Sequence, residues 1–96
     1  MSAVKYVKTD TTTREIHKVV VHRFRVGDVE DPDLYAAQPL HEWQNSPQGK
    51  FIMENAVDKP IWKRQINHLL YEYTYVIIAE LEKAKLSEFY LRWGKV

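Results

Sequence analysis

The stretch from Tyr71 to Leu81 constrains the fold more than any other part of the chain. It reads YEYTYVIIAEL, with apolar residues at both the odd and the even positions. Alternation over this length indicates a β-strand, and apolar residues on both parities indicate a strand that is covered on both faces. As a helix, the stretch would be hydrophobic all round, which a chain of 96 residues could hardly bury. The sequence therefore predicts that Tyr71–Leu81 is the central strand of an antiparallel sheet.

Three other segments are predicted to join this sheet. Arg14–Val26 is apolar on both parities at its centre and basic at its ends, Ile61–Leu69 alternates loosely, and Ser87–Trp93 alternates as a half-buried strand does. Residues 79–85 also have high helix propensity, so a C-terminal helix is an alternative to the last strand. Residues 1–13 are expected to form either a flexible arm or a short edge strand.

The segment from Pro32 to Val57 is predicted to be helical. Asp31 before Pro32 is a start signal, because aspartate accepts hydrogen bonds from free N–H groups and proline fits the first helical position. Ser46 and Pro47 repeat that signal, so we expect a break within residues 44–49 and a second helix after it. One uninterrupted helix with a proline kink is the alternative.

These elements predict a single α+β domain over residues 1–96, with the order β-α-β-β-β along the chain. One helical layer covers one face of an antiparallel sheet of three to four strands. Because the central strand is apolar on both faces, the other face needs a separate cover. We expect that cover to be a second copy of the chain, in a homodimer or a higher homo-oligomer. The interface residues expected on the central strand are Tyr71, Tyr73, Tyr75 and Ile77.

The composition excludes several classes of protein. The chain has no cysteine, which excludes disulfides, thiol catalysis and thiolate metal sites. A net charge of +1 gives no general attraction to nucleic acids or membranes. No apolar run approaches the ~20 residues that span a bilayer, and the N-terminus lacks a signal-like apolar segment. We therefore expect a cytoplasmic protein without a membrane partner.

Basic residues lie near aromatic residues at the ends of two predicted strands. That combination is what the binding of single-stranded nucleic acid requires, because bases stack on aromatic rings while cations contact the phosphates. Charged residues on sheet edges also prevent edge-to-edge aggregation, so the pattern has a second explanation. The residues expected to bind a nucleic acid or a small ligand are His22, Arg23, Arg25, Trp62, Arg64 and His68.

Motifs for catalysis and for metal binding are missing from the sequence. There is no GxSxG, no glycine-rich phosphate loop and no HExxH. His22 and His68 could meet across the sheet, but zinc needs three or four converging ligands. The acidic run over residues 28–33 lacks the spacing of a calcium loop, and helix capping with a solvated loop accounts for Asp31 and Asp33. A pair of His68 with Glu72 is the one acid–base alternative. We expect no catalytic residue, no metal and no cofactor.

The chain resembles a family of small proteins from T4-like phages of marine cyanobacteria and from marine metagenomes. The resemblance covers residues 21–57 and extends more loosely toward the C-terminus. The residues that carry it are His22, Arg23, Phe24, residues 27–37, Trp43, Gln44, residues 49–51 and residues 53–56. It implies a viral or environmental source and, if viral, a location in the host cytoplasm, and it brings no activity. The predicted topology is also similar to one half of the dimeric α+β barrels, although a second crossover helix is missing.

These patterns favour a non-catalytic accessory protein that self-associates through its sheet. The alternative is a module that binds a small ligand or single-stranded nucleic acid through the basic strand ends and the sheet aromatics. The two hypotheses differ in which residues must be accessible. Self-association needs an apolar sheet face free of helices, whereas nucleic-acid binding needs cations and aromatic rings on the same surface.

Overall fold

A computed structural model describes residues 3–9 and 12–95 of the chain. The described residues form one antiparallel sheet of four strands in the order β1-β2-β4-β3. The strands are β1 (Ala3–Thr9), β2 (Thr12–Val26), β3 (Ile61–Asn67) and β4 (Glu72–Glu82). The helices are α1 (Pro32–Asn45), α2 (Pro47–Asn55) and α3 (Lys83–Trp93). The predicted central strand is confirmed: β4 lies between β2 and β3 and starts and ends within one residue of the predicted segment.

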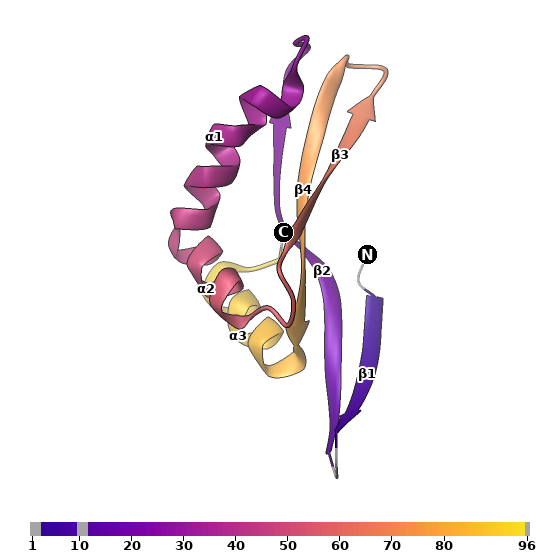
Figure 1. The fold of residues 1–96 in the computed structure, drawn as a ribbon, viewed down its shortest axis with the longest axis vertical. Coiled ribbons are helices and arrows are strands. Elements are labelled where there is room, and N and C mark those ends of the chain that lie inside the picture. The colour runs from indigo at the N-terminus through magenta and orange to yellow at the C-terminus, as the bar shows by residue number, and fades with distance from the viewer. Residues whose placement is uncertain (1–2, 10–11, 96) are drawn as a thin grey trace.

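The helices of the described chain lie on one side of the sheet, so the predicted α+β class with a single helical layer is confirmed (Figure 1). The main core lies between β2, β4 and the three helices. Its buried residues are Val19, Val21, Trp43, Phe51, Ile52, Ile77, Ala79, Leu81, Leu86 and Phe89. A second cluster of Val26, Ala36 and Tyr75 packs α1 against the other end of the sheet.

A β-bulge in β2 changes which residues of that strand face the helices. Val20 pairs with Ile78 and His22 pairs with Ile77, so Val21 is an extra residue without a partner on β4. Directly opposed residues of a strand pair share a face. Before the bulge, odd-numbered residues such as Val19 therefore face the helices, and after it even-numbered residues such as His22 do. The apolar residues on both parities of β2 thus result in part from this shift, and not from two covered faces.

The break between α1 and α2 lies where the sequence predicts it, at Ser46. The Ser46 hydroxyl accepts a hydrogen bond from the Gly49 N–H at 3.0 Å and donates one to the Trp43 carbonyl at 2.6 Å. The Ser46 side chain therefore caps both the start of α2 and the end of α1. Asp31 occupies the N-cap position of α1, but in the described structure its side chain makes no capping hydrogen bond.

The predicted last strand, Ser87–Trp93, is wrong, and the alternative of a C-terminal helix is confirmed. The segment belongs to α3, so the chain order is β-β-α-α-β-β-α. Leu86 and Phe89 are buried with the helical spacing of three, whereas Leu91, which the strand pattern places on the buried side, is 88% exposed. An aromatic-rich segment of this length fits both periods, and as a helix it buries Leu86 and Phe89.

The N-terminal segment, for which an arm and an edge strand were both expected, forms the edge strand β1 over residues 3–9. Residues 1, 2, 10 and 11 lie outside the described residues, so the arm is not tested there. The strand predicted from Ile61 ends at Asn67 rather than at Leu69. There the Asn67 side-chain oxygen accepts hydrogen bonds from the N–H groups of Leu69 and Leu70, which starts the turn into β4.

Candidate functional site

The side of the sheet that faces away from the helices is an accessible surface with an apolar centre, and we call it the open face. Cross-strand pairing arranges it in rows over β2, β4 and β3. The rows are Val20–Ile78–Ile61, Arg23–Val76–Lys63 and Arg25–Thr74–Gln65, and Lys18 opposite Glu80 extends the face along β2 and β4. Within the described part of the chain, no helix lies over these rows (Figure 1).

The apolar residues of the open face differ in how far their neighbours cover them. Ile61 on the edge strand is 47% exposed, and Val20 and Ile78 are half-buried. Val76 is 4% exposed although it belongs to neither of the helix-side clusters. It lies between Arg23 and Lys63, and the aliphatic stems of long cations cover neighbouring apolar surface in this way. The open face therefore has an apolar centre with a basic border.

The residues predicted for the subunit interface do not lie on the open face. Tyr75 and Ile77 are 0% and 4% exposed and pack under the chain's own helices, and Tyr73 shares their parity. Tyr71 lies in the loop before β4, 72% exposed, with a φ of 51°. The prediction placed the wrong set of alternate β4 residues at the interface. Both sets are apolar, and the set with the large aromatic rings fills the core. The β4 residues that face away from the helices in this region are Thr74, Val76 and Ile78.

The six predicted binding residues are distributed over two faces and a loop. Arg23 and Arg25 lie on the open face, because their partners on β4 are Val76 and Thr74. His22, Trp62 and Arg64 lie on the helix side, and His68 lies in the loop between β3 and β4. The structure therefore does not bring the six residues together in one patch.

His22 is held among aromatic rings on the helix side of the sheet. Its ring centroid lies 5.9 Å from that of Trp43, nearly parallel at 21°, and 6.0 Å from that of Phe24. Burial lowers the pKa of His22 below its usual value of 6.5, which favours the neutral imidazole. In this environment the side chain acts as a core aromatic residue.

A polar network ties β3 and β4 to the first turn of α1. The Tyr75 hydroxyl donates a hydrogen bond to Asp33 Oδ1 at 2.6 Å, and Arg64 donates to the same oxygen at 3.0 Å. Burial, followed by the hydrogen bond to Asp33, raises the pKa of Tyr75 to about 12. The Arg64 guanidinium also lies 5.3 Å from the centroid of the Tyr73 ring. Asp33 and Arg64 therefore have a structural function, namely to satisfy the hydroxyl of a buried tyrosine.

A second polar chain lies on the hairpin formed by β1 and β2. Tyr6 donates a hydrogen bond to Glu15 at 3.1 Å, and His17 lies 2.8 Å from the other Glu15 oxygen. The hydrogen bond with His17 lowers the pKa of Glu15, and the hydrogen bond to Glu15 raises the pKa of Tyr6. These groups are at the surface, where such contacts contribute little to stability.

The predicted pair of His68 and Glu72 lines a small cavity together with Asp28 and Tyr71. The cavity volume of about 70 Å³ corresponds to roughly two water molecules. Glu72 also forms an ion pair with Arg25 at 3.3 Å. Over residues 3–9 and 12–95, no group of three or more acidic or histidine side chains converges as a metal site requires.

The sequence-based choice of residues missed most of the open face. Lys18, Val20, Ile61, Lys63, Val76 and Ile78 lie there, and none was selected. The second apolar parity of β4 was the available signal for Val76 and Ile78. No local signal identified the bulge in β2, which moves Arg23 and Arg25 to the same face as Lys18.

Comparison of the chain with protein-family models, with curated proteins and with solved structures gives no match. Among the described residues, none of the helices has both the length and the apolar character needed to cross a bilayer. The geometry of the chain itself is therefore the basis for a proposed function.

Proposed function

We propose that the protein is a non-catalytic accessory protein that self-associates by packing the open face of one copy against that of another. The observation that carries this proposal is the apolar row Val20–Ile78–Ile61, which no helix of the described chain covers. Exposed apolar patches of this kind usually mark interaction sites. A symmetric dimer covers such a patch without requiring any other partner.

The size of the open face is compatible with a stable dimer. The 11 residues of β4 extend over ~36 Å, and three adjacent strands are ~14 Å wide, which gives an outline of roughly 500 Å². Side-chain relief makes the accessible area larger than this flat outline. The face thus approaches the ~800 Å² that each partner buries in an interface of standard size.

Sedimentation equilibrium at micromolar concentration tests this proposal. We expect a mass of about twice 11.4 kDa for the natural chain. Ile61→Asp places a charge in the apolar row at an already exposed position, so we expect a folded monomer. Leu91→Asp is the matched control, since Leu91 is 88% exposed on α3 and should leave the dimer intact. A natural chain that sediments as a monomer contradicts the proposal.

Binding of single-stranded nucleic acid is the second candidate, and one observation supports it. The cations Lys18, Arg23, Arg25 and Lys63 share the open face. The aromatic residues Phe24, Trp62, Tyr73 and Tyr75 belong to the opposite parity, so the cationic face lacks the rings on which bases stack. Salt-sensitive retention on immobilised single-stranded DNA that Arg23→Ala and Arg25→Ala abolish supports this candidate, and no retention at low salt eliminates it.

From the resemblance of residues 21–57 to phage proteins, we further propose a cellular setting, namely assembly in an infected host cell. The identity of the neighbouring genes in the source genome tests this part. Neighbours that encode virion or host-takeover proteins support it, and a chromosomal neighbourhood of housekeeping genes contradicts it.

A further inference from the structure

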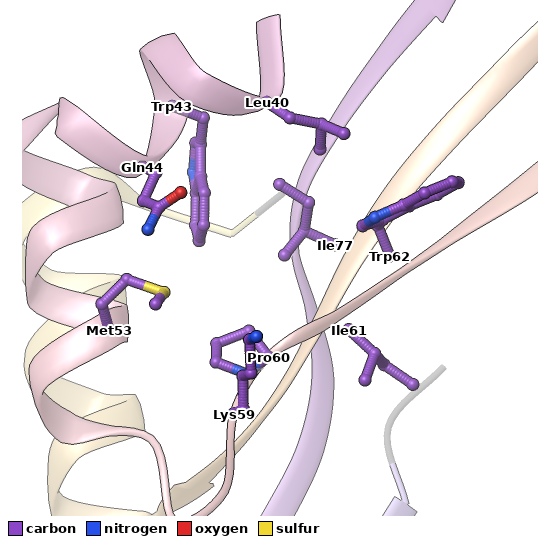
Figure 2. Close-up of a pocket in the computed structure, with 9 residues that line it drawn as sticks. All are labelled: Leu40, Trp43, Gln44, Met53, Lys59, Pro60, Ile61, Trp62 and Ile77. Atoms are coloured by element: carbon purple, nitrogen blue, oxygen red, sulfur yellow. The ribbon is translucent and has the colours of Figure 1, made fainter. Parts of the chain in front are cut away.

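A cavity of about 280 Å³ lies on the helix side of the sheet, between α1, α2 and the start of β3. Figure 2 shows Trp43 on one side of this cavity and Trp62 on the other, with Ile77 of β4 between them. Met53 of α2 and Lys59 of the loop before β3 also line the cavity. Four separate segments of the chain thus converge on one concave, mostly apolar space, as in binding sites for small molecules.

Two observations indicate a ligand, and the first is that Trp43 forms a fixed aromatic wall of the cavity. Trp43 is 6% exposed, its ring stacks on His22, and its carbonyl accepts a hydrogen bond from the Ser46 hydroxyl. Its Nε1 atom is buried and has no acceptor within hydrogen-bonding distance among residues 3–9 and 12–95, so the N–H group does not open onto the cavity. The contact that Trp43 offers a ligand is therefore the apolar surface of its ring.

The second observation is the charge of the lining. Lys59 is the charged residue among the nine lining residues in Figure 2, and its side chain is exposed. In the described residues it forms no ion pair. Its ammonium group gives an otherwise apolar cavity a preference for anions.

We propose that this cavity binds a small ring compound that carries a carboxylate. The ring packs between Trp43, Trp62 and Ile77, and the carboxylate pairs with Lys59. The volume corresponds to roughly nine water molecules, so a fused two-ring compound of about a dozen non-hydrogen atoms fits. This inference does not rest on self-association, because Trp43, Trp62 and Ile77 lie on the helix side of the sheet; of the lining residues, Ile61 also borders the open face.

The chain contains three tryptophans, Trp43, Trp62 and Trp93, which makes nuclear magnetic resonance a direct test. The probe is 1-naphthoate, an aromatic carboxylate, added to the ¹⁵N-labelled full chain. We expect saturable shifts of the indole N–H signals of Trp43 and Trp62. The signal of Trp93, which packs against Phe51 and Phe89 in the core, should move little. Unmoved signals at millimolar naphthoate, or equal shifts of all three, overturn the proposal.

Two variants and a neutral probe test the roles of the charge and the ring. Lys59→Met should weaken naphthoate binding about threefold to fivefold and leave the binding of neutral 1-naphthalenemethanol unchanged. Lys63→Met, which removes a nearby cation from the open face, is the matched control and should change neither. Trp62→Ala removes a wall at a position that is 45% exposed, and should weaken both probes. Equal naphthoate affinity in the Lys59→Met variant and the natural chain overturns the assignment of a carboxylate ligand.

Discussion

Tyr75 links the two layers of the molecule through a single side chain. It is fully buried, its ring stacks on Phe24 at 5.2 Å and 5°, and Trp62 lies 5.6 Å away on the other neighbouring strand. Its hydroxyl could not be buried at this position without an acceptor. Asp33 in the first turn of α1 provides one, so the start of the helix is fixed over the sheet by a hydrogen bond as well as by packing.

The first prediction concerns the loss of this hydroxyl. Tyr75→Phe keeps the ring and should lower the free energy of unfolding by about 1–2 kcal/mol at pH 7. The folded pKa is about 12, above the unfolded value of 10.0, so this contribution is complete below pH 10 and disappears as the pH rises to about 12. Denaturant unfolding of both proteins between pH 7 and 12 checks this, and a gap that stays constant above pH 10 contradicts it.

The second prediction concerns Gly49, where α2 approaches the end of α1. A Cβ atom at this position would lie 1.7 Å from the Trp43 carbonyl oxygen, so the two helices would have to separate. Gly49→Ala should cost about 1–3 kcal/mol despite the higher helix propensity of alanine. Gly27→Ala is the matched control, because a Cβ there has no described heavy atom within 4 Å. Thermal unfolding monitored by circular dichroism compares the two, and equal melting temperatures contradict the prediction.

At the scale of elements, the features predicted correctly are those that a few adjacent residues determine. The break at Ser46 is a local capping signal, and β4 has a long run of β-branched and aromatic residues. Residues 83–93 fit a helix and a strand equally in sequence, so contact with Phe51 of α2 and the sheet decides between them. Which face of β4 packs under the helices could not be predicted either. Both sets of alternate residues are apolar, and only their packing against the helices decides between the two faces.

The third prediction uses two adjacent residues on opposite faces of β4. Ile77→Asp places a charge under the helices, and we expect a loss of at least about 4 kcal/mol and a largely unfolded chain. Ile78→Asp changes the open face instead, so we expect a folded chain that no longer dimerises. Circular dichroism reports folding and sedimentation reports mass. Similar folding of both variants would show that the assignment of the faces is wrong.

At the scale of the whole molecule, the sheet is longer than the helical layer that covers it. The described chain measures 52 × 25 × 21 Å, with a radius of gyration of 15.1 Å. A compact domain of this length has a radius of about 12–13 Å. Figure 1 shows the cause: the hairpin of β1 and β2 extends beyond α3, and the hairpin of β3 and β4 extends at the opposite end of the sheet. A single copy thus leaves the two ends of its sheet beyond the cover of the helices.

The bulge at Val21 also bears on which changes of length β2 tolerates. Removing one residue from a regular strand turns every following side chain to the opposite face. In β2 the surplus residue already exists, so deletion of Val21 should restore a continuous alternation and leave His22, Phe24 and Val26 facing the helices. We expect this deletion to fold, with a loss of roughly 2–3 kcal/mol from the missing buried side chain. Deletion of Ile78 in the bulge-free β4 should abolish folding, and expression of both deletions with urea titration compares them. At this position, then, β2 can lose one residue while the side chains that follow keep their positions on the two faces of the sheet.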